Sequence, residues 1–351
     1  MIELMFIILI IYFIQILLFY LGWHRLPKFE IKTDLKLSIV IASRNEASNI
    51  PHLLHDLSNQ DYPTENVEII IVDDGSTDNS LELLKQSTFK IYESDGVGKK
   101  AAIDQAIRQS TYDLILTTDA DCRLPKNWIK SMIAPFSQKE VQMICGPVAI
   151  GQIKSFFQKC QALEFMSLMG STAGAIGIGH AFMSNGANMA FRKSIYFNSE
   201  KNIASGDDVF LLHHVKKKGG EIVFVKDKNA IVQTQAELTL KGFFNQRKRW
   251  ASKSTSYKDV FAVWISLLVL LTNVAFVSLL LQANYVEWLF FFMFKSMIDT
   301  FFMISLSSFF GFRKYLNMVL IVQLLYPFYV LWVALSAQFS SYHWKDRKHK
   351  K

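Results

Sequence analysis

The sequence predicts an α/β domain with a mainly parallel sheet, joined at both ends to α-helices that span a membrane. Residues 27–255 alternate short β-branched runs with helical patterns, whereas residues 1–21 and 261–340 are almost entirely apolar. Hydrophobic residues occupy 51% of the 351 positions and charged residues 19%. This composition excludes a disordered chain, and the clustering of the apolar residues excludes a wholly soluble protein.

The chain carries 38 basic and 30 acidic residues, a formal net charge of +8. In a membrane protein such an excess usually lies beside the bilayer, so we expect a membrane surface and no nucleic-acid partner. The three cysteines, Cys122, Cys145 and Cys160, lack CxxC spacing. Their scatter indicates a reducing compartment and no zinc site.

Residues 1–24 are predicted to form a retained transmembrane anchor. Leu4–Leu21 is apolar apart from Gln15 and is long enough to span a bilayer. A cleaved signal peptide would begin with basic residues, whereas the start of this chain carries Glu3 and no Lys or Arg. Three basic residues follow the anchor and place the next domain in the cytoplasm by the positive-inside rule: Arg25, Lys28 and Lys32.

The C-terminal part, residues 259–340, is predicted to hold about three transmembrane helices. The apolar runs are Phe261–Leu281, Trp288–Phe310 and Tyr315–Ala337. Three spans after a cytoplasmic domain would place the tail, residues 341–351, outside, yet its basic residues favour the inside. The number of spans and the side of the C-terminus therefore stay open. Lys295 and Asp299, four residues apart in the middle run, are interpreted as a mutually neutralised structural pair, with a role on a substrate path as the alternative.

Residues 25–237 are predicted to form the α/β domain, because strands and helices alternate along them. Expected strands are Leu37–Ala42, Val67–Val72, Phe89–Tyr92 and Asp113–Thr118. The expected helices run from Ser48 or Asn49 towards Asn59, from Ser76-Thr77-Asp78 through Lys85, and from Gly98 through Arg108. This order predicts a parallel sheet whose ligands bind at the carboxyl ends of the strands.

Acidic residues follow two of these strands directly. Asp73 and Asp74 come after the second strand, where a carboxylate can accept hydrogen bonds from a base or ribose, and Gly75 permits a tight turn. The plainer interpretation is a turn with a helix N-cap, which suffices for Asp78. Two adjacent acids exceed what capping needs.

Asp119-Ala120-Asp121 follows the fourth strand. In an extended segment, residues i and i+2 point to the same side, so the two carboxylates would converge on one point. That geometry suits Mg²⁺ or Mn²⁺, which would keep waters and bridge to substrate phosphates. The alternative is a solvated turn before Pro125.

A third acidic pair, Asp207 and Asp208, follows Gly206 and precedes the apolar helical run Val209–Val215. One of the two can serve only as an N-cap. The other is a candidate general base.

A basic helix, residues 238–258, is expected to lie at the membrane interface. Gln246, Arg249 and Trp250 have i, i+3 and i+4 spacing and so share one helical face. That face could present a guanidinium to a diphosphate and an indole to the apolar face of a sugar. The alternative is lipid-headgroup binding, which accounts for Lys241, Lys253 and Lys258.

The stretch Cys160–Met183 is apolar and resembles another span, but it is rich in glycine and contains His180. We interpret it as a flexible segment at the membrane surface, near the place where an acceptor substrate would bind.

Taken in order, these motifs resemble those of the membrane-bound family 2 glycosyltransferases. The match covers about residues 37–255, and the nearest relatives look like processive polysaccharide synthases and the ceramide-glucosyltransferase type. Its elements are Asp73-Asp74, Asp119-Ala120-Asp121, Asp207-Asp208 and Gln246-x-x-Arg249-Trp250. Further matches are Ser43-Arg44-Asn45-Glu46, Gly98-Lys99-Lys100 and the small-residue stretch 185–192.

The resemblance implies a Rossmann-like GT-A fold and an inverting single displacement from a nucleotide sugar, with UDP favoured. It implies that Asp73 or Asp74 binds the uracil or ribose, and that Arg44, Asn45, Glu46, Lys99 and Asp119 contact the donor. Asp119 and Asp121 would hold Mg²⁺ or Mn²⁺ with the diphosphate. Gln246, Arg249 and Trp250 would bind the diphosphate and the acceptor.

Asp208 would be the catalytic base. Many processive synthases carry Thr-Glu-Asp where this chain has Gly206-Asp207-Asp208, so Asp207 stays an alternative. About four spans favour transfer of single sugars to a lipid or lipid-linked acceptor at the cytoplasmic face. A processive synthase working with a partner subunit or as an oligomer is the alternative. Outside this class, the alternatives are a membrane nucleotidyl- or phosphotransferase and a non-catalytic scaffold.

Overall fold

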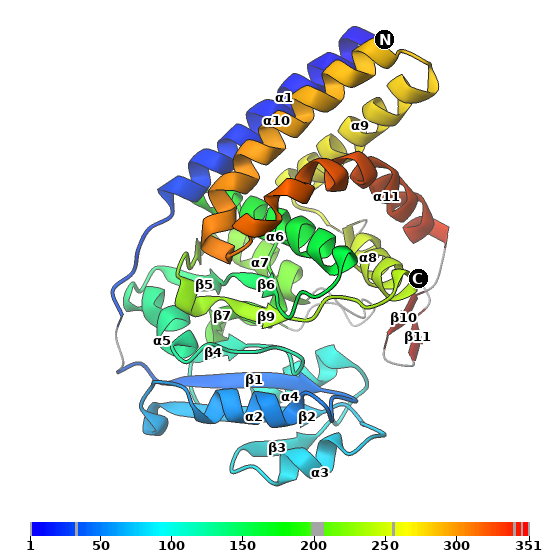
Figure 1. Ribbon diagram of the computed structural model, residues 1–351. Coiled ribbons are helices and arrows are strands. Elements are labelled where there is room, and N and C mark those ends of the chain that lie inside the picture. Colours follow the sequence, from blue (N-terminus) through cyan, green and yellow to red (C-terminus); the bar gives the residue numbers. More distant parts are fainter. Residues whose placement is uncertain are drawn as a thin grey trace. The chain divides into compact units, whose positions relative to one another are not determined.

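The computed structural model describes residues 2–31, 34–197, 207–254, 257–339, 342–344 and 347–349 (Figure 1). Lys32, Gly206 and the side chain of Asp207 lie outside the described residues. The chain forms two compact units, and it passes between them four times. The sheet unit comprises Leu26–Gly151 and Met183–Gln235, and the membrane unit comprises Met1–Arg25, Gln152–Phe182 and Ala236–Lys351.

The sheet unit is built on seven strands in the order β3-β2-β1-β4-β7-β5-β8. Their bounds are β1 Leu37–Ser43, β2 Val67–Asp73, β3 Lys90–Glu93, β4 Leu114–Thr117, β5 Val141–Cys145, β7 Met189–Arg192 and β8 Glu221–Phe224. All are parallel except β7, which pairs antiparallel with both β4 and β5. The prediction of a mainly parallel sheet is confirmed, and the four predicted strands lie within one or two residues of their expected bounds.

Helices fill the connections between the strands. They are α2 Ile50–Ser58, α3 Ser80–Lys85, α4 Lys99–Gln109, α5 Trp128–Ile133 and α7 Asp207–Lys217. Pro51 lies in the first turn of α2, where its missing N–H costs nothing. Helix α3 begins later than expected, because the Asp78 carboxylate accepts the Ser80 N–H at 3.0 Å and holds the preceding turn.

The core of the sheet unit contains apolar strand residues and one fully buried side-chain amide, that of Asn188. Asn188 is fully buried, and its Nδ2 donates to the carbonyls of Pro147 and Ala230, each at 2.8 Å. Its Oδ1 accepts the indole N–H of Trp128 at 2.9 Å. This residue therefore ties α5 and the start of β7 to the small parallel pair β6 Val148–Ile150 and β9 Val232–Thr234.

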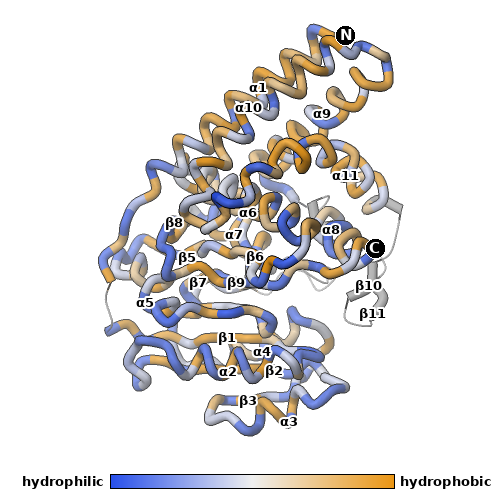
Figure 2. Tube along the Cα trace, in the orientation of Figure 1, coloured by the Kyte–Doolittle hydropathy of each residue, from blue (hydrophilic) through white to orange (hydrophobic). Residues whose placement is uncertain are grey.

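The membrane unit is helical, apart from a short hairpin of β10 Tyr342–Trp344 and β11 Arg347–His349. Its helices are α1 Ile2–Arg25, α6 Phe156–Gly177, α8 Leu240–Ser254, α9 Val260–Leu281, α10 Tyr285–Phe310 and α11 Val319–Phe339. Among the described residues, four helices are long and apolar enough to cross a membrane: Ile2–Arg25, Val260–Leu281, Tyr285–Phe310 and Arg313–Ala337. Figure 2 shows their mostly hydrophobic course.

The apolar side chains of these helices divide into an inner and an outer set. An inner cluster of Met5, Leu9, Phe276, Leu279 and Phe291 joins α1, α9 and α10. Large apolar side chains on the outer faces are exposed instead, which a soluble protein would avoid and a bilayer would cover.

The segment Cys160–Met183 is not a flexible stretch as we expected, because residues 160–177 belong to helix α6. Its glycines provide close packing against α1. A Cβ on Gly174 would lie 2.3 Å from the carbonyl oxygen of Phe19, and one on Gly177 would lie 2.1 Å from that of Gly22. Small residues let two helix backbones approach each other, as in many membrane helix pairs.

Lys295 and Asp299 form the predicted ion pair on α10, with Nζ and Oδ2 2.7 Å apart. The Tyr12 hydroxyl donates to the other oxygen of Asp299 at 2.7 Å, which links α1 to α10. The interpretation of this pair as mutually neutralised is confirmed.

Candidate active site

The predicted donor-binding residues gather at the carboxyl ends of β1 and β2. These strands are paired in register to their last residues, with Ser43 opposite Asp73. The chain then turns outward on both strands, and the Asp74 N–H donates to the Ser43 carbonyl at 2.8 Å. The parallel pairing thus brings Arg44-Asn45-Glu46 beside Asp73-Asp74, as the sequence predicted.

The two neighbouring carboxylates have different surroundings, although both residues are only 2% exposed. Asp73 accepts the backbone N–H and the hydroxyl of Ser76, at 2.9 and 2.5 Å, and so forms its own turn. Asp74 instead contacts the segment between β3 and α4, where its Oδ1 accepts the Gly98 N–H at 2.7 Å. Asp74 is therefore the member of the pair that lies beside Lys99.

The Arg44-Asn45-Glu46 segment closes over the Asp73-Asp74 turn. Arg44 Nη1 donates to the carbonyls of Asp74 and Gly75, at 2.5 and 2.9 Å. Asn45 has a φ of 50°, a left-handed conformation that asparagine tolerates better than most residues, and its Oδ1 accepts the Thr77 N–H at 2.8 Å. The Glu46 carboxylate accepts from Asn49 Nδ2 at 2.6 Å. These bonds fix the loop shape before any ligand binds.

Asp119-Ala120-Asp121 does not continue β4 as an extended segment. The strand ends at Thr117, and the chain turns so that the Cys122 N–H donates to the Asp119 carbonyl at 3.1 Å. The expectation of an extended arrangement was wrong. Asp119 nonetheless forms an ion pair with Lys99 at the start of α4.

Lys99 gathers the predicted catalytic carboxylates around one positive charge. Burial alone would lower the pKa of Lys99, but the charges of Asp119, Asp208 and Asp121 outweigh it, so the pKa is raised. The three carboxylates thus come from two separate parts of the sequence and act on a single ammonium group. The sequence predicted a cation site at Asp119 and Asp121 and a base at Asp208, but it did not predict that Lys99 would pair with Asp119.

Burial raises the pKa of the Cys122 thiol well above its usual range, and the charges of Asp121 and Asp119 raise it further. The thiol therefore stays protonated, and its Sγ lies 3.7 Å from Asp121 Oδ1.

The oxygen donors at this edge fit a hard divalent cation. Asp119 and Asp121 supply carboxylates, the ligands that Mg²⁺ and Mn²⁺ prefer. The hydroxyl of Thr118, just before them, is buried and has no hydrogen-bond partner within the described part of the chain. Among the described residues, no three His, Cys, Asp or Glu side chains could hold a metal ion by themselves. A cation here would therefore need further oxygens from a phosphate or from water.

Asp208, in the first turn of α7, is tied to the end of β4 through one glycine. Its Oδ2 accepts the Gly186 N–H at 3.1 Å, and its Oδ1 accepts the Val209 N–H at 2.9 Å. The Gly186 carbonyl in turn accepts the hydroxyl of Thr117 at 2.7 Å. Sequence reasoning missed this connection, because neither Thr117 nor Gly186 carries a recognisable chemical signal alone.

The Gln246-x-x-Arg249-Trp250 motif lies on α8 of the membrane unit, as a helix, as predicted. The arginine of this helix that is buried in an ion pair is Arg247, for which the sequence predicted no role. Arg247 is 4% exposed, and its Nη2 lies 2.7 Å from the Glu164 carboxylate on α6. Glu164 could have been noticed in the sequence, since it is the sole acidic residue in residues 156–177.

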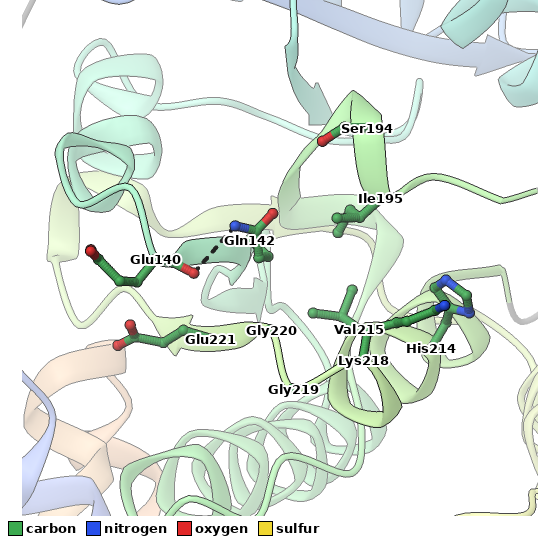
Figure 3. Close-up of a pocket in the computed structure, with 10 residues that line it drawn as sticks. All are labelled: Glu140, Gln142, Ser194, Ile195, His214, Val215, Lys218, Gly219, Gly220 and Glu221. Carbon is green, nitrogen blue, oxygen red and sulfur yellow. Dashed lines mark hydrogen bonds between the residues drawn. The ribbon is translucent and has the colours of Figure 1, made fainter.

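A separate pocket of about 650 Å³ lies in the sheet unit, away from these residues (Figure 3). Its lining residues are Glu140, Gln142, Ser194, Ile195, His214, Val215, Lys218, Gly219, Gly220 and Glu221. It borders the amino ends of β5 and β8, whereas the acidic motifs follow carboxyl ends. It also lies at the far end of α7 from Asp208, roughly 15 Å away at 1.5 Å per residue. The pocket is therefore not part of the candidate active site.

Comparison with known proteins shows what this chain is similar to. Residues 38–197 match the family model described as Glycosyl transferase family 2. A poly-β-1,6-N-acetyl-D-glucosamine synthase of Staphylococcus epidermidis is 26% identical over 230 residues, which cover 61% of this chain and 53% of that protein. The enzyme of the same name from Staphylococcus aureus (strain COL) is 26% identical over 249 residues, covering 65% and 57%. The chain spans only a little over half the length of these relatives.

A solved structure shares the fold. The mannosyltransferase PcManGT from Pyrobaculum calidifontis, in complex with GDP-Man and Mn²⁺, aligns with a TM-score of 0.56 and 14% identity. The alignment covers 97% of this chain and 99% of that one. The predicted GT-A fold class is confirmed, and the family model matched by residues 38–197 is the one that the motifs resemble.

Proposed function

Because this chain carries a family 2 glycosyltransferase domain at residues 38–197, we propose that it is a membrane-bound, inverting glycosyltransferase. It transfers a sugar from a nucleotide sugar, with UDP as the nucleotide, to an acceptor hydroxyl. The observation that carries the proposal is geometric: Asp119 pairs with Lys99 just after β4, and Asp208 is linked through Gly186 to Thr117 at the end of the same strand. The sheet unit faces the cytoplasm in this proposal, because basic residues follow α1.

Asp208 is the general base of the reaction. Its carboxylate takes the proton of the acceptor hydroxyl as that oxygen forms a bond to the anomeric carbon of the donor sugar. The bond between the anomeric carbon and the diphosphate oxygen breaks, and the nucleoside diphosphate leaves with the electron pair. Two backbone N–H groups, of Gly186 and Val209, fix the orientation of the Asp208 carboxylate. Asp207 is the alternative base.

The donor is held at the ends of β1, β2 and β4. Asp74, beside the start of α4, binds the uridine, and the loop Arg44-Asn45-Glu46 closes over it. Asp73 shapes the turn that presents Asp74. Lys99 offers positive charge to the diphosphate, for which it exchanges its present partner Asp119.

Asp119 and Asp121 hold a divalent cation, Mg²⁺ or Mn²⁺. When bound, the cation supplies positive charge to the diphosphate as negative charge develops on it. On the membrane unit, Gln246 and Arg249 bind the diphosphate end of the donor, and Trp250 lies against the acceptor sugar.

Two classes of acceptor fit different observations. Four candidate spans are few for enclosing a polymer, which favours single transfer to a lipid or lipid-linked acceptor. The relatives named as poly-β-1,6-N-acetyl-D-glucosamine synthases favour a growing polysaccharide, with an N-acetylglucosamine donor and a partner subunit or oligomer.

The test is nucleoside diphosphate release by the full chain in nanodiscs, against a panel of nucleotide sugars with membrane lipids added. We expect release from one donor, lost on treatment with EDTA and reduced at least 1,000-fold in Asp208→Asn. Asp227→Asn is the matched control, because Asp227 also accepts two hydrogen bonds, from Ser131 and Asn229, outside the acidic cluster.

The products then distinguish the alternatives. Pyrophosphate in place of nucleoside diphosphate would indicate a nucleotidyltransferase. Neither turnover nor nucleotide-sugar binding would indicate a scaffold. Extraction of a single glycosylated lipid identifies the first acceptor class, whereas a product of increasing length identifies the second.

A further inference from the structure

Arg247 of α8 is enclosed by aromatic rings and a carboxylate. Its guanidinium carbon lies 4.2 Å from the ring centroid of Trp250 and 4.6 Å from that of Phe243. Both distances are well within the range of cation–π contact. The side chain is 4% exposed, so these rings and the neighbouring carboxylate largely replace water around the charge.

The carboxylate of Glu164 fixes the plane of that guanidinium. Arg247 Nη2 and Nε donate to its two oxygens at 2.7 and 3.3 Å, the two-point geometry available to arginine but not to lysine. The Tyr329 hydroxyl donates to Glu164 Oε1 at 3.0 Å. Glu164 comes from α6 and Tyr329 from α11, so both helices determine where the guanidinium lies.

The same guanidinium touches two residues of the predicted motif. Arg247 Nη1 donates to Gln246 Oε1, which leaves the amide Nε2 of Gln246 as the donor end of that side chain. The opposite contact, with Trp250, sets the plane of the indole, which also lies beside the ring of Phe165. A change in Arg247 would therefore act on Gln246 and Trp250 together.

Stability alone is a weak reason for such a pair. Buried ion pairs can often be replaced by apolar or neutral residues with little loss of stability, although removing one partner is costly. From the contacts to Gln246 and Trp250 we propose that Arg247, fixed by Glu164 and Tyr329, is a positioning residue that orients these two side chains for substrate. The inference rests on the proposed function of the Gln246-x-x-Arg249-Trp250 face.

The experiment compares full-length variants in nanodiscs. Arg247→Lys keeps the charge but not the flat, two-point contact. The double variant Glu164→Gln/Arg247→Gln removes both charges and leaves neither one buried alone. The matched control is Lys295→Gln/Asp299→Asn, which neutralises another buried pair of the same unit. Turnover, KM, thermal stability and the ¹⁹F resonance of 5-fluorotryptophan at position 250 are measured, and Trp250→Phe assigns the resonance.

We expect Arg247→Lys and the double Gln variant to shift the Trp250 resonance and to reduce kcat/KM 10- to 100-fold. The double variant should keep a melting temperature near that of wild type, which separates positioning from folding. The Lys295→Gln/Asp299→Asn control should leave the Trp250 resonance and kcat/KM unchanged.

Wild-type kcat/KM in the double Gln variant would overturn the inference and assign the pair to folding alone. An unshifted Trp250 resonance in Arg247→Lys would overturn it as well, whether or not the chain is active. Absence of turnover in the wild-type protein with every donor would refute the proposed function, while the resonance would still decide whether Arg247 orients Trp250.

Discussion

The ammonium of Lys99 forms an ion pair with the carboxylate of Asp119, across the 20 residues that separate the start of α4 from the end of β4. Asp121 and Asp208 also act on this ammonium. The free protein thus neutralises part of its acidic cluster with one of its own side chains. On binding, a diphosphate would pair with the ammonium of Lys99, and a cation would bind the carboxylate of Asp119. Each ligand would therefore replace one partner of the internal pair.

Replacing Lys99 by methionine should affect the two ligands in opposite directions. The KM for the nucleotide sugar should rise about 10-fold or more, because a positive charge for the diphosphate is lost. Binding of Mn²⁺ without donor should strengthen several-fold, because Asp119 loses its internal partner. Electron paramagnetic resonance of Mn²⁺ and steady-state kinetics measure the two effects. Lys85→Met, which breaks an exposed pair with Glu93, is the control, and weakened Mn²⁺ binding by Lys99→Met would contradict the prediction.

Adding one methyl group at Gly174 should destabilise the contact between α1 and α6. Its Cβ would lie 2.3 Å from the Phe19 carbonyl oxygen, so backbone would have to move. Overpacking of this kind costs about 1–3 kcal/mol. Thermal unfolding in detergent should show a lower midpoint for Gly174→Ala than for Gly170→Ala, whose Cβ would have the side chain of Leu306 and not backbone as its nearest neighbour. Equal midpoints would contradict this account of the glycines.

Glu68 should make the stability of the sheet unit depend on pH in acid. Burial alone would raise the pKa of Glu68, but hydrogen bonds from Lys90, Ser38 and Thr111 lower it to about 2. A folded pKa below the unfolded value, about 4.3 for glutamate, gives stability that is complete above that value and is lost as the pH falls towards 2. At neutral pH the contribution is about 3 kcal/mol.

The variant Glu68→Gln tests this dependence. It should unfold at lower temperature than wild type at pH 7, and the difference should shrink between pH 4.5 and pH 3. Glu65→Gln, in the turn before β2, provides the comparison. A difference that does not change with pH would show that the carboxylate charge at position 68 is not the cause.

Asn188 should be the least replaceable amide of the sheet unit. Asn188→Ala would leave the Trp128 N–H and the carbonyls of Pro147 and Ala230 without their present partner in the interior. Buried groups left unsatisfied cost about 1–3 kcal/mol each. The loss should appear as a lower unfolding midpoint, and the exposed amide of Asn59, changed to alanine, should cost far less. Similar losses for both would contradict the role of Asn188.

The strands and the acidic motifs could be predicted because their signals are local. Val67–Asp73 is β-branched and apolar and ends in an acid, so both the strand and the position of Asp73 follow from one short segment. Parallel pairing then brings the ends of neighbouring strands together without further information. The resemblance to family 2 glycosyltransferases, which residues 38–197 match, followed from the order of these local motifs.

What could not be predicted depends on contacts between distant segments. Arg247 and Glu164 are 83 residues apart. The sequence Arg247-Lys248-Arg249 does not indicate which of its three basic side chains is buried. The glycines of α6 reduce helix propensity, so the sequence suggested a flexible segment. In the structure they allow α1 to pack closely against α6. The turn at Asp119 is likewise closed by a backbone hydrogen bond from the Cys122 N–H to the Asp119 carbonyl, which the residue types do not indicate.

The position of α6 in the chain limits how the protein can be divided for experiments. A fragment of residues 26–235, cut to keep the whole sheet unit, would still contain Gln152–Phe182, which belongs to the membrane unit. In that fragment the glycine face of α6 would have lost α1, and Glu164 would have lost Arg247 and Tyr329. A water-soluble catalytic fragment would therefore need a short linker in place of residues 152–182, and trimming the ends alone should yield an aggregating product.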